Sequence, residues 1–465
     1  MIALSIVCIY YQCNINKGVF MDLSLFFVAG AGIALLLFLV ITLRVPAFLA
    51  LLVTSLLVGL ASGLQPDEVL NSIKNGMGGT LGFVAIVVGL GAILGQVLES
   101  AGGIERIASS LIRSFGPEKV QWSLGVTGFI VAIPVFFDVA FIILAPLLYG
   151  LANRSGRSLL YYAIPLLAGL AITHSFIPPT PGPIAVAELV NADLGWVILF
   201  GALTGIPAMI IAGPWFGKII ANKIFIAVPE AHKTNHKTSD QPSPSFAWVA
   251  SIILLPLILI MLATTGPFFL DESSGLLTVL SFLGHPFVAL SIATIFAMFI
   301  AHTKCKLSTH SLLNIANKGL EPAGVVILIT GAGGAFKQVL IDSGVGQMLA
   351  SVFIEAQFSV FILGFLIAAI TRIAQGSATV AMITGAGLIA PVLELHPMSA
   401  PSLGLLVIAI SSGATILSHV NDSGFWLVSR YLGMSEKDTL KSWTVMTTLI
   451  SLTGLASCLV ISIFL

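Results

Sequence analysis

The chain has 465 residues, of which 57% are hydrophobic and only 9% are charged. Soluble domains carry about 25% charged residues, so this composition excludes an ordinary water-soluble fold and indicates a polytopic α-helical membrane protein. Twenty Lys and Arg balance twenty Asp and Glu, and this zero net charge gives no basis for binding to nucleic acid. Forty-five glycines and 22 prolines suit membrane helices that pack closely and break.

Residues 1–20 fit a signal peptide poorly, because only Lys17 is charged and no basic segment comes before their apolar stretch. Met21 is an equally good start for the apolar run that follows. We therefore expect residues 1–20 to be an N-terminal extension or the product of a misplaced start codon. The four cysteines form no CxxC pair and show no metal-ligand spacing, so no metal site is predicted.

Apolar runs divide the first half of the chain into candidate spans of about 20 residues. A block at 119–150 is too long for one crossing and is broken at Ile133-Pro134. Cationic residues flank it on both sides, which predicts a re-entrant hairpin that returns to its own face. The long run at 159–190 is interrupted by the sequence PPTPGP and is predicted to be a broken helix. The remaining predicted elements are spans at 23–43, 46–64, 80–100 and 196–217 and a more polar stretch at 101–118.

The second half repeats this order after a hydrophilic linker at 218–245. We assign residues 21–217 to a first transmembrane repeat and 246–465 to a second. The second repeat contains a second predicted hairpin at 357–395 and a second broken span at 400–431. Its other predicted elements are spans at 246–270, 276–301, 321–341 and 440–465 and a short piece near 345–355.

Orientation follows from the distribution of Lys and Arg. With the linker in the cytoplasm and the sides alternating, sixteen of these residues fall on the cytoplasmic side and two on the outer side, as the positive-inside rule expects. The first hairpin then enters from the cytoplasm and the second from outside.

Internal similarity supports two repeats of opposite orientation. Gly89 and the triplet from Gln96 match Gly331 and the triplet from Gln338 at an offset of 242, and His174 lies near the same offset from His419. An odd number of crossings separates the halves, so the repeat is inverted. Inverted repeats with broken helices are typical of secondary transporters, which place a binding site at mid-membrane.

The few polar groups inside apolar segments cluster at the four predicted breaks. An ionisable residue in hydrocarbon costs about 2.5–3.5 kcal/mol on insertion scales and normally faces a cavity or a partner. Half-helix N-termini and a guanidinium attract a carboxylate, while hydroxyl and amide groups suit substrate hydroxyls. The candidate substrate-binding residues are Arg372, Thr173, Ser175, Gly182, Ser377, Thr379, Asn421 and Ser423. The candidates for proton coupling are Asp138, Asp422, His174 and His419.

Each of these roles has a structural alternative. Arg372 could extend to the outer interface, Asp138 could cap the start of a helix, and the two histidines could hold the helix breaks together by hydrogen bonds. The aromatic pair Phe136 and Phe137 is expected to be packing.

Five segments carry a resemblance to a known family. They are FFDVAFIILAPL (136–147), HSFIPPTPGPIAVAELVNADLG (174–195), GAGGAFKQVLIDSGVG (331–346), QGSATVAMITGAGLIAP (375–391) and SHVNDSGFWLV (418–428). From about Asp22 to its C-terminus, the chain resembles the gluconate:proton symporter (gluconate permease, GntP) family of bacterial inner membranes. The resemblance implies uptake of gluconate or related sugar acids, and a wider ion-transporter architecture of hairpins and broken helices that often forms dimers working as elevators.

We therefore expect a secondary transporter that imports a small hydroxylated monocarboxylate with a proton. We predict no cofactor beyond the coupling ion, no enzymatic activity, a multi-pass location in the bacterial inner membrane with the linker cytoplasmic, and a homodimer. Asp138 or Asp422 would couple the proton.

Several alternatives stay open. A sodium-coupled carboxylate carrier would share this architecture, since backbone carbonyls and Asn or Ser oxygens also suit Na⁺. A D-serine or glycerate permease of the same family would present the same polar groups. An intramembrane enzyme is disfavoured because the sequence has no HExxH, GxGD-type or DDxxD motif.

Overall fold

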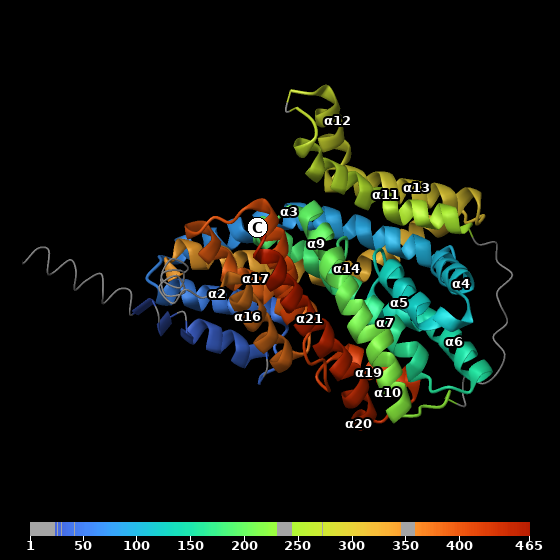
Figure 1. Ribbon diagram of the computed structural model, residues 1–465. Coiled ribbons are helices and arrows are strands. Elements are labelled where there is room, and N and C mark those ends of the chain that lie inside the picture. The colour runs from blue at the N-terminus through green and yellow to red at the C-terminus, as the bar shows by residue number, and fades with distance from the viewer. Residues whose placement is uncertain are drawn as a thin grey trace, which may run out of the picture.

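The computed structural model describes residues 24–25, 27–28, 30–40, 42–229, 244–271, 273–345 and 359–465. Within these ranges the chain folds into helices joined by short loops, with no β-strand (Figure 1). Nine of the described helices are long and apolar enough to cross a membrane. The predicted all-α polytopic membrane fold is confirmed. The predicted extension at 1–20 and most of the piece predicted near 345–355 lie outside the described residues.

In the first half, a helical segment at Gly30–Val40 precedes α2. A π-helical turn at Ile211–Trp215, which contains Pro214, joins the last two helices into one continuous span. The helices are α2 (Ala47–Ala61), α3 (Pro66–Ser100), α4 (Gly103–Phe115), α5 (Val120–Val131), α6 (Phe137–Ser155), α7 (Leu160–Phe176), α8 (Pro181–Leu189), α9 (Leu194–Ile210) and α10 (Phe216–Lys223).

The second half ends on a span that also contains a π-helical turn, at Leu440–Thr444. Its helices are α11 (Phe246–Thr265), α12 (Gly275–Leu283), α13 (Pro286–Thr303), α14 (Thr309–Asp342), α16 (Val360–Gln375), α17 (Ala378–Leu395), α18 (Ala400–Gly413), α19 (Ser423–Leu432), α20 (Glu436–Thr439) and α21 (Val445–Ser462).

Two predicted boundaries in this half and one in the first half are wrong. The predicted single span at 276–301 is two helices, because Pro286 starts α13 after a turn at Gly284 and His285 accepts the Phe287 N–H at 3.3 Å as its cap. The predicted spans at 80–100 and 321–341 are only the C-terminal parts of α3 and α14, which have 35 and 34 residues. Polar residues in the first turns of both helices hide these beginnings from a hydropathy profile.

Both predicted hairpins are present. In the first, α5 ends at Val131 and α6 begins at Phe137, with Pro134 in the turn, where its missing N–H cannot continue a helix. In the second, Gly376 ends α16 with a φ of +90° and its N–H donates to the Arg372 carbonyl at 2.9 Å. Ser377 then caps α17 by accepting the Val380 N–H at 3.3 Å.

Both predicted broken helices are present as well. Residues 177–180 separate α7 from α8, which begins within the PPTPGP sequence, and residues 414–422 separate α18 from α19. Each first half-helix packs against the first arm of its own hairpin, α7 on α5 and α18 on α16. Each second half-helix packs on the hairpin of the other half, α8 on α17 and α19 on α6.

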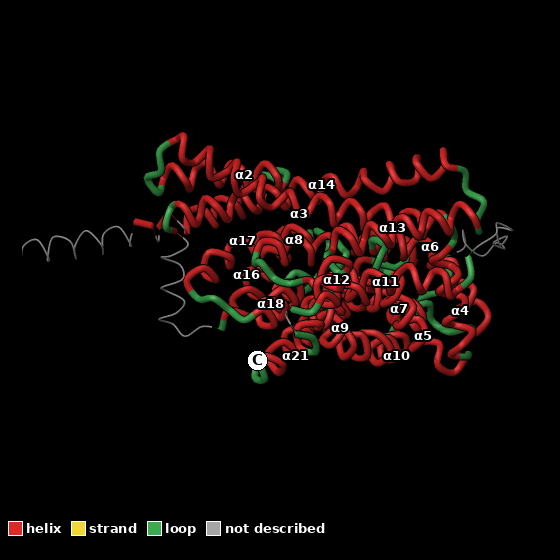
Figure 2. Tube along the Cα trace, turned by 90° about the horizontal axis from the view of Figure 1, so that it is seen from above, coloured by secondary structure: helices red, strands yellow, loops and turns green. Residues whose placement is uncertain are grey.

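The two long helices form the other part of the structure. Helices α3 and α14 run side by side, as Figure 2 shows. They are antiparallel, because Gly319 near the start of α14 lies against Ala92 and Gly334 near its end lies against Gly76. Helix α2 packs on α14 and α13 packs on α3, so here too each half of the chain covers the other.

Candidate functional site

A cavity of about 400 Å³ lies where the helix breaks meet. Its size falls in the range of about 300–1,000 Å³ that is usual for small-molecule sites. The N-termini of α6, α17 and α19 all open onto it, whereas the N-terminus of α8 does not. Since N–H groups at helix N-termini favour negative charge, the backbone alone makes this cavity suitable for an anion.

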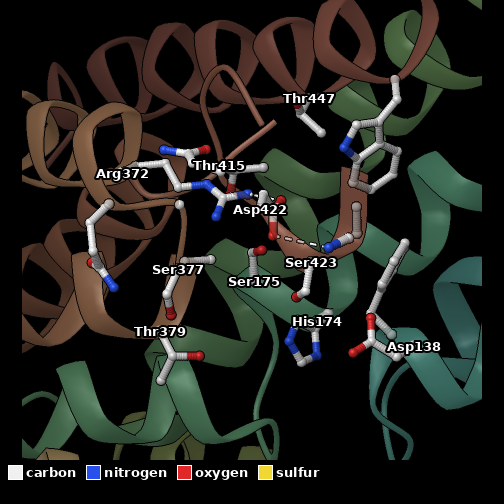
Figure 3. A pocket seen from close by; sticks show the side chains of 18 of the residues that line it. Asp138, His174, Ser175, Arg372, Ser377, Thr379, Thr415, Asp422, Ser423 and Thr447 are labelled. Atoms are coloured by element: carbon white, nitrogen blue, oxygen red, sulfur yellow. Dashed lines mark hydrogen bonds and ion pairs between the residues drawn. The ribbon is translucent and has the colours of Figure 1, made fainter. Parts of the chain in front are cut away.

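Most of the residues predicted for substrate binding or proton coupling line this cavity. They come from both halves of the chain and from five different helices or the loops next to them (Figure 3). The nine that line it are Asp138, His174, Ser175, Arg372, Ser377, Thr379, Asn421, Asp422 and Ser423.

An ion pair in the cavity wall joins the second hairpin to the second broken helix. Arg372, near the end of α16, donates through Nη2 to Oδ2 of Asp422, the N-cap residue of α19. Only 5% of Arg372 and 9% of Asp422 are exposed. The other carboxylate oxygen, Oδ1, accepts the Gly424 N–H at 3.1 Å. A charge so deeply buried is stable only when it is paired in this way.

Ser418 links the carboxylate of Asp422 to the final span by hydrogen bonds. Its hydroxyl donates to Asp422 Oδ2 and accepts the Trp443 Nε1–H at 2.6 Å. Its backbone N–H donates to Thr447 Oγ1 at 3.2 Å, and its carbonyl accepts the Thr444 hydroxyl. The final span thus holds the second helix break in position.

Several polar atoms around the cavity lack a partner among the described residues. The Nε and Nη1 atoms of Arg372 are buried and make no hydrogen bond. The same is true of Gln375 Oε1 and His174 Nδ1. Buried polar groups are normally paired, so these atoms mark where a polar ligand would complete the site. Two guanidinium donors beside a free amide oxygen fit a molecule that carries both a carboxylate and hydroxyl groups.

Asp138 lies across the cavity from Arg372 (Figure 3). It occupies the first turn of α6, its side chain is exposed, and it has no hydrogen bond or ion pair within the described part of the chain. His174 also lines the cavity, with its ring centroid 6.2 Å from that of Phe136. The cavity therefore holds one cation, two carboxylates and one histidine.

Three predicted site residues do not line the cavity. Thr173 donates to the Phe129 carbonyl at 2.8 Å and so ties α7 to α5. Gly182 lies in α8 against the sulfur of Met382. His419 Nε2 lies 2.9 Å from the Ile373 carbonyl, which also accepts the Asn421 Nδ2–H at 2.9 Å. His419 thus connects the second break to α16, the structural alternative considered for it.

The sequence-based prediction missed several cavity residues. Gln375 sits inside a conspicuous motif without being one of the predicted site residues, and Phe136 and Phe137 are predicted to be packing. Thr415 and Thr447 carry no local signal, because hydroxyls in apolar helices commonly bond to their own backbone, as Thr415 does to the Ser411 carbonyl at 2.8 Å. Trp443 carries none either, because an aromatic side chain in an apolar span is ordinary. All six line the cavity.

Comparison with known proteins gives one consistent result. The profile of the GntP family permeases matches residues 23–464. The low-affinity gluconate transporter of Escherichia coli K12 is 40% identical over 432 residues, which cover 93% of this chain and 97% of that protein. The gluconate permease of Pseudomonas aeruginosa is 40% identical over 433 residues, with 92% and 96% covered. The Gnt-II system L-idonate transporter of Escherichia coli K12 is 39% identical over 436 residues, with 94% and 98% covered.

A solved structure shows a similar fold. The crystal structure of the YdaH transporter of Alcanivorax borkumensis, described as having an unusual topology, superposes with a TM-score of 0.60. It covers 90% of this chain and 97% of its own, at 14% sequence identity. At that identity the likeness concerns the arrangement of helices alone.

Proposed function

The chain belongs to the GntP family of permeases, and from this premise we propose that it imports gluconate or a closely related sugar acid together with a proton. Gluconate and L-idonate are the substrates named for its relatives. Each is a monocarboxylate in which all of the remaining carbon atoms carry a hydroxyl group. Such a molecule needs one cationic group and many hydrogen-bonding partners.

The buried guanidinium of Arg372 is the observation that carries this proposal. Its Nε and Nη1 donors are free, and it borders a cavity on which three helix N-termini converge. A substrate carboxylate would take these donors. The substrate hydroxyls would bond to the oxygen and nitrogen atoms around the cavity, from Ser175, Gln375, Ser377, Thr379, Thr415, Asn421, Ser423 and Thr447.

Proton coupling rests on the acids of the same cavity. Asp138 and Asp422 are carboxylates within a membrane-spanning region, and such groups are typical of proton relays. His174 lines the same cavity and is a further candidate. Sodium is the alternative coupling ion, because carbonyl, carboxylate and hydroxyl oxygens at helix breaks also suit Na⁺.

We further propose that the hairpins and broken helices move as one body against α3 and α14, in a homodimer in the bacterial inner membrane. Where α3 contacts the hairpins and broken helices, backbone packs directly on backbone. A Cβ on Gly95 would lie 2.0 Å from the Pro134 carbonyl, and one on Gly91 would lie 3.3 Å from the Pro179 carbonyl. Bare backbone at these positions lets the two surfaces approach closely without interlocking side chains.

The test is uptake of labelled gluconate into proteoliposomes that contain the full chain, under an imposed inward proton gradient and without sodium. We expect accumulation that a protonophore abolishes. Uptake that requires a sodium gradient instead would contradict proton symport and retain the carrier. Absence of uptake for gluconate, L-idonate, glycerate and D-serine, with either ion, would contradict the proposed function.

A further inference from the structure

We propose that Asp422 competes with the substrate carboxylate for Arg372, and that this competition is what links the proton to the substrate. The inference rests on the proposed function and deepens it by assigning the coupling to one acid of the cavity. In the structure Asp422 holds Arg372. A proton on Asp422 would release the Nη2 donor and the positive charge of Arg372 for the substrate.

The charges in the cavity set Asp422 and the substrate carboxylate against each other. With Asp422 ionised, the charge of Arg372 is already neutralised by a carboxylate that is 9% exposed. A second carboxylate at the same guanidinium would leave a net negative charge in a buried cluster, which is costly. When Asp422 is protonated, Arg372 and the substrate carboxylate form a neutral pair. Substrate and proton therefore favour each other's binding.

Asp422 keeps its other hydrogen-bond partners after it has lost the bond to Arg372. The hydroxyl of Ser418 has one donor and two acceptor sites, and Trp443 uses one acceptor site at 2.6 Å. Ser418 now donates to Asp422, and by rotating its hydrogen it can instead accept a hydrogen bond from the O–H of a neutral Asp422. The Gly424 N–H continues to bond to Oδ1. The neutral acid thus keeps its partners, and only the bond to Arg372 is exchanged.

Asp138 and Asp422 differ in whether they have an ion pair to exchange. Asp138 also lines the cavity, but it is exposed and has no ion pair to lose among the described residues. The other titratable groups facing Asp422 are Arg372 on α16 and His174 on α7. The break after α18 contributes Thr415, the π-helical turn contributes Trp443, and α21 contributes Thr447.

The experiment measures protons and gluconate together on the purified full chain. In weakly buffered solution with a pH indicator, the wild-type protein should take up about one proton per gluconate bound, and the affinity should fall about tenfold per pH unit once Asp422 is ionised. Asp422→Asn should take up no proton and bind gluconate independently of pH. In proteoliposomes it should exchange gluconate but not accumulate it.

Two comparisons make the result decisive. Asp271→Asn, the same change in an exposed loop before α12, should behave as the wild type. Asp138→Asn should keep the uptake of one proton per gluconate, and this result tests the assignment even if Asp422→Asn does not fold. Loss of proton uptake in Asp138→Asn, or its persistence in Asp422→Asn, would overturn the inference. Gluconate binding without proton uptake by the wild type would also overturn it, whereas a wild type that neither binds nor transports gluconate would refute the proposed function itself.

Discussion

Gly376, at the turn of the second hairpin, is in a backbone conformation and a contact that favour glycine. Its φ is +90°, and a Cβ there would lie 2.2 Å from the Asn421 carbonyl. An L-residue in this conformation costs roughly 1–2 kcal/mol, and the close carbonyl adds to that cost. Asn421 and Asp422, which follow one another at the second break, depend on this turn.

We therefore expect Gly376→Ala to weaken gluconate binding at least tenfold while the protein still reaches the membrane. The added methyl group would push the 421–422 segment away from α16 and displace Asp422 from Arg372. Equilibrium binding of labelled gluconate to purified protein measures the effect. Gly324→Ala, in α14 with nothing within 4 Å of the new Cβ, is the matched control, and equal affinities for the two variants would contradict the prediction.

The buried ion pair gives a second prediction for single residues. Arg372→Ala leaves Asp422 buried without its cation, and removal of one partner of such a pair costs about 3–5 kcal/mol. Thermal denaturation in detergent should show a large loss of stability. The double change Arg372→Met with Asp422→Asn should recover much of it, because neither partner is then left unpaired. Arg113→Ala, on the exposed side of α4, should change little, and a double variant no more stable than Arg372→Ala would argue against a coupled pair.

The sequence identifies both members of this pair but not their contact. A charge in an apolar segment is conspicuous because hydrocarbon penalises it, so Arg372 and Asp422 stand out individually. Fifty residues separate them, and only the meeting of hairpin and broken helix brings them together. Thr447 and Trp443 could not be found at all, because an alcohol or an aromatic ring within an unbroken span is ordinary.

Among the elements, the helix breaks were predictable and some helix lengths were not. Proline and glycine act through local backbone geometry, so Pro134, the PPTPGP sequence and Gly376 mark their breaks directly. The division between α12 and α13 was missed, because a hydropathy profile does not register one turn at Gly284. The long N-terminal parts of α3 and α14 were missed because they are less apolar and depend on mutual packing.

Close backbone contact between paired helices gives a prediction at this scale. A Cβ on Gly169 in α7 would lie 2.2 Å from the Gly125 carbonyl of α5, and one on Gly413 in α18 would lie 2.1 Å from the Phe365 carbonyl of α16. Alanine at either position should destabilise the protein by about 1–3 kcal/mol through overpacking. Thermal unfolding in detergent should show a similar decrease for both variants. Gly150→Ala in α6, where nothing lies within 4 Å, should leave the melting temperature unchanged, and no decrease for the first two would refute this account of the packing.

For the whole molecule, the orientation in the membrane remains a prediction from the distribution of Lys and Arg. In a variant without its native cysteines, Ser273→Cys before α12 should react with an impermeant thiol reagent added to intact cells. Lys437→Cys in α20 should react only after the membrane is opened. Both residues are exposed, so accessibility through the membrane is the variable measured. The reverse pattern would invert the proposed topology.

The exchange of partners between the two halves has a consequence for how the protein folds. Helix α2 covers α14 and α13 covers α3, while α8 covers α17 and α19 covers α6. A chain of half this length could not bury these surfaces alone, but two copies inserted in opposite directions would bury them on each other. Neither half is therefore expected to fold without the other.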